Sequence, residues 1–247
     1  AGFQPIVALP AGNTVGYETL VRWRHPTRGV LPAGMWIESA ESSASIIHRI
    51  GLITAWHAAA FATHLPVDHV VTVNVSGSHL TARSFPEFVD LISDLNTKHP
   101  NRLVLELTET TLANLDRTST DHFIRLVDSG VGLWADDFGT GFSSVSHLRD
   151  LPLTGLKLDK SFTSAMTNQD STAFRIASGL AGLSDGLGLQ TVAEGVETVE
   201  QAQLVTAAGW SLGQGWLFGK PAPATHYRDD VSDVDSVHLL HPSNLPA

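Results

Sequence analysis

The stretch VGLWADD, residues 131–137, is an apolar run that ends on two carboxylates, Asp136 and Asp137. Apolar runs of this length are typical of buried strands, and a carboxylate at the end of such a strand places a charge where the chain leaves the core. Three other runs have the same form, VVTVN ending at Asn74, LVLE at Glu106 and LQTVAE at Glu194. Successive ends are separated by about thirty residues, or twice that, which is the spacing of βα units. The sequence therefore predicts parallel strands whose polar ends gather around one mouth.

Two strands are expected before these four, and two more among and after them. FQPIVAL (3–9) and VGYETLVRW (15–23) are joined by a turn that is too short for a crossover helix, so they must be antiparallel. GLKLD (155–159) and LGQGWLF (212–218) complete a set of eight strands. We therefore expect an α/β fold, a TIM-like (β/α) barrel with an antiparallel first strand.

Helices are expected between most of the strands. The Ala-rich and periodic stretches that predict them lie at residues 36–64, 84–95 and 117–129. A further helix should begin with a capping box of Thr198 and Gln201 and stop at Gly209. This alternation of helix and strand is what a barrel of βα units requires.

Length and hydropathy indicate one large domain. A chain of 247 residues has the usual size of an α/β barrel, so we expect a single domain over residues 1–247, with 226–247 as an irregular C-terminal tail. The chain is 43% hydrophobic but has no apolar stretch near the twenty residues of a membrane span. We expect a cytoplasmic location. The abrupt start on a strand suggests that regulatory domains precede the chain.

Charge and residue types exclude several classes of protein and site. Fifteen Lys and Arg residues against twenty-five Asp and Glu give a formal net charge of −10, which argues against a nucleic acid polymer as partner. Because the sequence has no cysteine, disulfides and thiolate metal sites are excluded. The twelve histidines show no HExxH or other ligand spacing, so they are predicted to be surface or packing residues.

Side chains two residues apart on a strand share a face, which predicts what else lies at the mouth. This rule places Glu18, Leu20 and Arg22 on one face of the second strand, and Lys157 and Asp159 on one face of the sixth. Several carboxylates that converge repel one another unless they take up protons or bind a cation. Carboxylate and amide oxygens without thiolates or paired imidazoles favour Mg²⁺ or Mn²⁺ over zinc.

With these residues the chain closely resembles the EAL family of cyclic di-GMP phosphodiesterases. The likeness runs from Phe3 to the KPAPA segment after Phe218, which is nearly the whole chain. The segment that gives the family its name is Glu18-Thr19-Leu20 here. The matching pieces are FQPIV, GYETLVRWRHP, VNVS, LELTE, DDFGTGFSS, LKLDKSF, AEGVE and QGWLF.

The resemblance implies a role for each matching polar residue. The expected ligands of a first metal ion are Glu18, Asn74, Glu106 and Asp136, and those of a second are Asp136 and Asp137. Lys157 resembles the lysine that orients or deprotonates the attacking water, and Glu194 the carboxylate that holds a metal-bound water. The substrate-binding residues are expected to be Arg22, Gln214, Leu20 and Asp159. Glu109 resembles the glutamate that anchors the loop after the double aspartate.

The expected function is metal-dependent hydrolysis of cyclic di-GMP to linear pGpG by an activated water. Two metal ions about 3.5–4 Å apart stabilise both the attacking and the leaving oxygen of such a displacement. The sequence has no cysteine nucleophile, GxSxG turn or GxxxxGK[ST] loop, in agreement with direct attack by water. A lysine near the water either lowers its pKa by charge or accepts its proton, and the sequence leaves both alternatives open.

Two other functions fit parts of the same pattern. The first is an EAL-like receptor, weakly active or inactive, that binds cyclic di-GMP or a protein partner. The second is an unrelated barrel enzyme that uses magnesium on another phosphorylated substrate. The resemblance also suggests a homodimer. One departure from the family pattern is Thr19 in place of alanine, whose hydroxyl needs a partner if it is buried.

Overall fold

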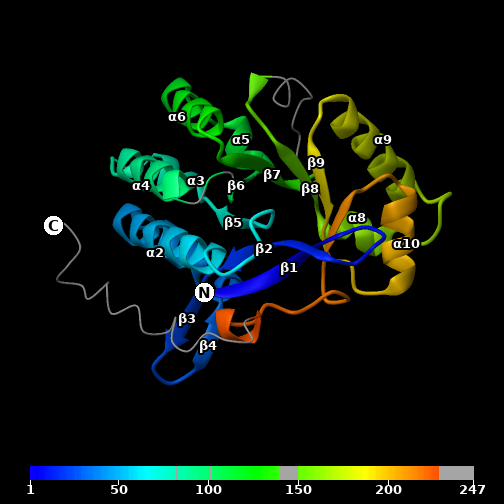
Figure 1. The fold of residues 1–247 in the computed structure, drawn as a ribbon, viewed down its shortest axis with the longest axis horizontal. Coiled ribbons are helices and arrows are strands. Elements are labelled where there is room, and N and C mark those ends of the chain that lie inside the picture. Colours follow the sequence, from blue (N-terminus) through cyan, green and yellow to red (C-terminus); the bar gives the residue numbers. More distant parts are fainter. Residues whose placement is uncertain (82, 99, 101, 140–149, 228–247) are drawn as a thin grey trace.

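The structure, a computed structural model, describes residues 1–81, 83–98, 100, 102–139 and 150–227. Its centre is a closed barrel of eight strands in the order β1-β10-β9-β8-β7-β6-β5-β2 (Figure 1). The strands are β1 (Gly2–Ala8), β2 (Thr14–Leu20), β5 (Val70–Asn74), β6 (Leu103–Thr108), β7 (Gly132–Phe138), β8 (Gly155–Leu158), β9 (Gln190–Ala193) and β10 (Leu212–Gln214). Strand β1 is antiparallel to both of its neighbours, and the other neighbouring pairs are parallel. The predicted TIM-like barrel with an antiparallel first strand is confirmed.

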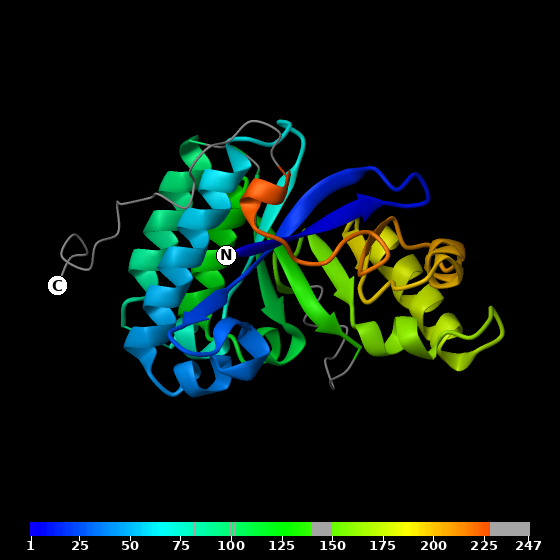
Figure 2. The same ribbon diagram turned by 90° about the horizontal axis from the view of Figure 1, so that it is seen from below.

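Helices cover the outside of the barrel. Helices α2, α4 and α6 stack side by side on one side, and α9 and α10 lie on the other (Figures 1 and 2). The helices are α1 (Ile37–Glu41), α2 (Ala44–Ala62), α3 (Gly77–Leu80), α4 (Phe85–Lys98), α5 (Glu109–Ala113), α6 (Arg117–Asp128), α8 (Lys160–Ala165), α9 (Thr172–Gly186) and α10 (Val199–Ala207), with 3₁₀ turns η1 (Ala33–Met35) and η2 (Ala224–Tyr227). Among the described residues, no helix combines the length and the apolar character that a bilayer span needs.

The barrel interior is built in two layers that follow from strand periodicity. The lower layer is apolar and consists of Ile6, Val104, Trp134 and Val192. Two residues along each of the same strands, on the same face, the side chains become polar. These polar side chains are Gln4, Glu106, Asp136 and Glu194. The apolar layer thus forms a floor, and the polar layer lies above it at the carboxyl ends of the parallel strands, where barrel enzymes have their active sites.

A glycine makes room for the largest side chain of this floor. A Cβ atom at Gly155 would lie 2.5 Å from the Trp134 ring, closer than real contacts allow. The Trp134 side chain therefore fills the space inside strand β8, and two residues later the same strand carries Lys157 into the polar layer.

Some predicted elements were wrong in their bounds. The second strand ends at Leu20, and residues Arg22–His25 form a separate strand, β3, which pairs with β4 (Gly29–Pro32) as a hairpin beside the barrel. The long helix expected over 36–64 is divided into α1 and α2, because Ser43 has an extended backbone. The eighth strand ends at Gln214 rather than near 218. Of the tail expected over 226–247, the first two residues end η2 and the rest lies outside the described residues.

Candidate functional site

Lys157 lies at the centre of the polar layer and is fully buried. Its Nζ atom is 2.6 Å from Glu194 Oε1, 3.2 Å from Glu106 Oε1, 3.3 Å from Asp136 Oδ1 and 3.7 Å from Glu18 Oε2. We call these five residues the rim cluster. Four of them come from four different strands, and Glu194 directly follows a fifth, β9; only closure of the barrel brings them together.

The rim cluster has more negative charge than one lysine neutralises. Burial opposes the charge on Lys157, yet the surrounding carboxylates raise its pKa well above the usual range. Burial and the neighbouring carboxylates together raise the pKa of Glu106 well above its usual range and that of Glu194 to about 8, despite the lysine. Both carboxylate oxygens of Glu106 accept no hydrogen bond from the part of the chain that is described. The cluster therefore favours the binding of additional positive charge.

Two amides hold Glu18 in place. Asn74 Nδ2 donates to Glu18 Oε1 at 2.7 Å, and Gln214 Nε2 donates to Glu18 Oε2 at 2.7 Å. Asn74 is on β5, which neighbours β2, and Gln214 is on β10, which is separated from β2 by β1. The structure thus brings Asn74 and Gln214 to the same carboxylate, which is at most 3.7 Å from the lysine.

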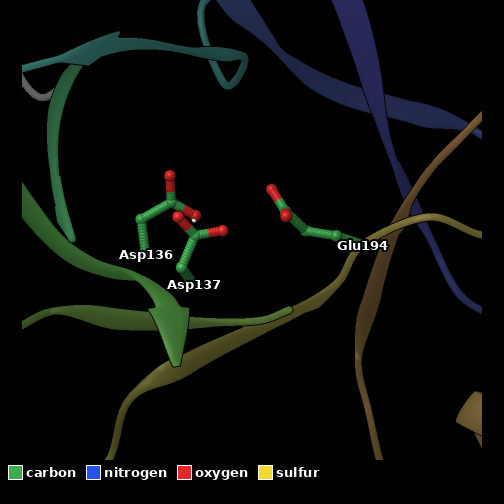
Figure 3. A group of neighbouring side chains, drawn as sticks. All are labelled: Asp136, Asp137 and Glu194. Carbon is green, nitrogen blue, oxygen red and sulfur yellow. Dashed lines mark hydrogen bonds between the residues drawn. The ribbon is translucent and has the colours of Figure 1, made fainter. Parts of the chain in front are cut away.

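The double aspartate is turned so that both carboxylates face the mouth. Successive residues of a regular strand point to opposite faces. Here the register of β7 against β8 shifts between Ala135 and Phe138, and Asp137 has the left-handed φ of 53°. Oxygens of Asp136, Asp137 and Glu194 consequently lie within 4.8 Å of one another, with Glu194 facing the two aspartates (Figure 3). Burial and the nearby Asp136 and Asp159 carboxylates raise the pKa of Asp137 to about 6.

These oxygens fit a hard divalent cation. The donors within reach are carboxylates and one amide, which are the ligand types of Mg²⁺ and Mn²⁺. Such an ion would relieve the mutual repulsion of the carboxylates and would give Glu106 Oε2, which accepts no hydrogen bond from the described residues, a partner.

The loop after the double aspartate begins at a fixed point. Gly139 N donates to Glu109 Oε2 at 2.8 Å, and Glu109 is buried at the start of α5. Gly139 has a φ of 99°, and a Cβ there would lie 2.6 Å from the Phe162 ring. The remaining residues of the predicted loop, 140–149, lie outside the described residues.

A cavity of about 460 Å³ opens above the rim cluster. It is lined by Gln4, Glu18, Asp136, Lys160, Glu194, Gly195, Glu197, Gln214, Gly215 and Trp216. The volume is that of a pocket for a small molecule.

The profile of the EAL domain matches residues 2–221. The chain belongs to the EAL domain family. Among its relatives, the cyclic di-GMP phosphodiesterase RocR of Pseudomonas aeruginosa is 34% identical over 239 residues, which cover 94% of this chain and 59% of RocR. The cyclic di-GMP phosphodiesterase PA2567 of the same bacterium is 33% identical over 227 residues, 89% of this chain and 38% of PA2567. This EAL domain thus spans less than two thirds of each of these relatives.

Solved structures of relatives share the fold. The PaMucR phosphodiesterase in its c-di-GMP complex superposes with a TM-score of 0.82 at 33% identity, covering 92% of this chain and 93% of PaMucR. BlrP1 of Klebsiella pneumoniae, in a manganese and cy-diGMP complex at pH 6, gives a TM-score of 0.74 at 28% identity over 90% of this chain and 55% of BlrP1.

All four predicted substrate-binding residues of this EAL domain lie outside the rim cluster, although Gln214 donates to its Glu18. Arg22 follows the end of β2, where its Nη1 donates to Val21 O, and it lines a second cavity of about 200 Å³. Burial lowers the pKa of Arg22, and Glu18 acts against this effect. Leu20 is the last residue of β2 and is half-buried. Strand β8 ends at Leu158, so Asp159 lies beyond it. Asp159 is the N-cap of α8, and its Oδ1 accepts a hydrogen bond from Ser161 N.

Sequence reasoning assigned no role to Lys160 and Trp216, which both line the cavity. Each lies two residues after the end of a strand, where the alternation of side chains has stopped. Lys160 lies within the matching piece LKLDKSF, and Trp216 within QGWLF. Their position just beyond a strand end is the sequence signal that could have placed them at the mouth of the barrel.

Thr19 points away from Glu18 into the layer between barrel and helices, as strand parity predicts. Its side chain is buried, and its Oγ1 has no hydrogen-bond partner among the described residues. Thr19, which stands in place of the family alanine, therefore fits into this layer, but its hydroxyl makes no hydrogen bond within the described residues.

Proposed function

We propose that this EAL domain hydrolyses cyclic di-GMP to linear pGpG with Mg²⁺ or Mn²⁺ as cofactor. The observation that carries the proposal is the convergence of Asp136, Asp137 and Glu194 within 4.8 Å beside a buried lysine. Relatives named as cyclic di-GMP phosphodiesterases support the choice of substrate. In the reaction, water attacks one phosphorus, the P–O bond to the ribose O3′ breaks, and that oxygen takes up a proton.

The proposed metal ligands are the oxygen donors of the polar layer, namely Glu18, Asn74, Glu106, Asp136 and Asp137. A bound divalent ion polarises the phosphoryl group and lowers the pKa of water. Asn74 and Gln214 orient Glu18 through the two hydrogen bonds that they donate to it. We propose that Gln214, at the cavity wall, also contacts substrate.

We propose that Lys157 acts as an ammonium ion. Its four carboxylate neighbours raise its pKa, so the protonated form dominates at neutral pH. A charged lysine orients a water and stabilises hydroxide, but it does not accept the water's proton. Of the two roles left open by the sequence, the electrostatic one is favoured. We propose that Glu194, 2.6 Å from Lys157, accepts the hydrogen bond of the attacking water.

The remaining roles concern substrate and loop. We propose that Arg22, Leu20 and Asp159 bind substrate from beyond the strand ends, and that Glu109 anchors the loop through Gly139 N. Lys160 supplies a cation on the cavity wall, where an anionic ligand needs one. We further propose a single domain over residues 1–247, association as a homodimer, and control by attached regulatory domains.

The deciding experiment is incubation of the purified chain with cyclic di-GMP and Mg²⁺ or Mn²⁺, with pGpG measured by chromatography. Glu18→Ala and Asp136→Asn should abolish turnover while the circular dichroism of the barrel is retained. Asp94→Asn is a matched control, because Asp94 is an exposed carboxylate of α4 paired with Lys98. Full activity in either rim variant would refute the metal assignment. Tight binding of intact substrate without turnover would identify a receptor.

A further inference from the structure

Thr72 places a hydroxyl in the interior of the barrel, below the rim cluster. On β5, Val70 packs against the apolar floor, and Asn74 donates to Glu18 in the polar layer. Thr72 lies two residues from each of them and therefore faces the same interior. Val73, which lies between Thr72 and Asn74, belongs instead to the larger hydrophobic cluster that joins strands and helices. The Thr72 side chain is thus located between the floor and the polar layer.

The hydroxyl of Thr72 is enclosed by the protein. The side chain is fully buried, and its Oγ1 makes no hydrogen bond to the part of the chain that is described. Valine has nearly the same shape and would suit an apolar floor, whereas a buried hydroxyl that bonds to nothing destabilises the fold. A threonine at this position therefore indicates an acceptor inside the barrel.

Strand pairing places two carboxylates next to Thr72. Its register partner on β2 is Glu18, and its register partner on β6 is Val104, two residues before Glu106. Both oxygens of Glu18 already accept hydrogen bonds from amides. Glu106 Oε1 lies 3.2 Å from Lys157 Nζ, but Oε2 accepts no hydrogen bond from the described residues. Glu106 Oε2 is thus an acceptor that needs a donor, on the strand next to a donor that needs an acceptor.

We propose that Thr72 is a positioning residue for Glu106: its hydroxyl donates to a buried water, which in turn donates to Glu106 Oε2. Thr72 and Glu106 share no direct hydrogen bond, and one water can bridge buried polar atoms that lie beyond direct contact. A carboxylate that is held in this way has a fixed orientation, and such hydrogen bonds to ligands contribute to metal affinity. This inference rests on the proposed function, in which Glu106 is a metal ligand.

The test is the affinity for Mn²⁺ in the absence of substrate, measured from the electron paramagnetic resonance signal of free Mn²⁺. Thr72→Val keeps the shape and removes the hydroxyl, so it should weaken Mn²⁺ binding by about 10- to 100-fold. Thr72→Ser keeps the hydroxyl and removes a methyl group, so its affinity should stay within about threefold of the wild type. A role in packing alone would give the reverse order, because serine disturbs the packing more than valine does.

Thr19→Val is the matched control. Thr19 lies on the neighbouring strand β2 and is also buried, with no partner for its hydroxyl among the described residues, but it faces the helices. This variant should bind Mn²⁺ like the wild type, and circular dichroism checks that all three variants are folded.

The possible outcomes separate this role from the proposed function. Wild-type affinity in Thr72→Val, or equal weakening in Thr72→Val and Thr72→Ser, would overturn the positioning role and leave the proposed function standing. A wild-type chain that binds Mn²⁺ but does not hydrolyse cyclic di-GMP would overturn the proposed hydrolysis alone. A wild-type chain that binds no Mn²⁺ would overturn both.

Discussion

The barrel mouth and the helical layer both bury ionisable side chains, but they satisfy them in opposite ways. In the rim cluster, four carboxylates surround one lysine. In the helical layer, His48 on α2 and His79 on α3 share a hydrogen bond of 3.0 Å, and His48 Nε2 lies 3.2 Å from Glu87 Oε2 on α4. Both ring nitrogens of His48 have a hydrogen-bond partner, whereas the rim cluster retains an excess of negative charge.

The difference indicates which region serves stability and which serves function. Burial and the nearby His48 lower the pKa of His79 to about 4, so this side chain is neutral near pH 7. A neutral, hydrogen-bonded His79 between helices has a low desolvation cost. Carboxylates held together in the barrel mouth repel one another, and such an arrangement is retained where it binds a cation or reacts. We expect changes in the two regions to separate activity from stability.

Lys157→Met should give the largest effect. Removing the lysine leaves four carboxylates, three of them buried, without their cation. We therefore expect turnover to fall by about 10³-fold or more and stability to fall by about 3–5 kcal/mol. Asp136→Asn removes one of the repelling charges, so it should be equally inactive but no less stable than the wild type. Turnover assays and urea unfolding check both variants. If Lys157→Met were as stable as the wild type, the lysine would not be what holds the carboxylates together.

His79 should make the free energy of unfolding depend on pH, without changing the rim cluster. The pKa of His79 is lowered from 6.5 to about 4 in the folded chain, so the unfolded chain binds more protons between these two values. The stability contributed by neutral His79 is complete above about pH 6.5 and is lost as the pH falls towards 4, by about 3 kcal/mol in total.

Unfolding by urea at a series of pH values measures this contribution. His79→Gln, which does not titrate, should flatten the slope of stability between pH 6.5 and 4. His64→Gln is the matched control, because His64 is exposed and should leave the slope as it is. An unchanged slope in His79→Gln would show that another group is responsible for the acid sensitivity.

Metal binding at the rim cluster should stabilise the folded chain. At a concentration one hundred times the dissociation constant, a ligand specific for the folded state adds about 2.7 kcal/mol. The midpoint temperature of thermal unfolding should therefore rise with Mg²⁺ or Mn²⁺ in the wild type and in His79→Gln, but not in Asp136→Asn. An equal shift in Asp136→Asn would place the bound metal elsewhere.

Local patterns predicted most of the barrel from the sequence. The capping box of Thr198 and Gln201 is present, and Gly209 ends that helix with a φ of 96°, because both features depend only on neighbouring residues. The β3–β4 hairpin was missed because Arg22–His25 follows the second strand after a single residue. Whether such a segment continues a barrel strand or pairs with Gly29–Pro32 is decided by tertiary contacts.

The site was predictable where strand periodicity holds. Glu106 and Lys157 point into the barrel because they lie an even number of residues from other inward side chains. Periodicity could not predict Asp137, whose left-handed backbone turns it towards Asp136. It also could not be extended to Arg22, because β2 ends at Leu20. The resemblance to the family supplied the roles of Asp137 and Arg22, which remain predictions.

Thr19 offers the smallest and most local change, on the strand that carries Glu18. Its Oγ1 is buried without a partner among the described residues, and an unsatisfied buried hydroxyl costs free energy. Thr19→Val keeps the β-branched shape and removes this group, so it should raise the free energy of unfolding by about 1 kcal/mol. Thr19→Ala also removes the hydroxyl but leaves a small void, so its gain should be smaller. Because the side chain faces the helices, both variants should keep the kcat of the wild type. A stability loss in Thr19→Val, measured by urea unfolding, would mean that the hydroxyl has a partner after all.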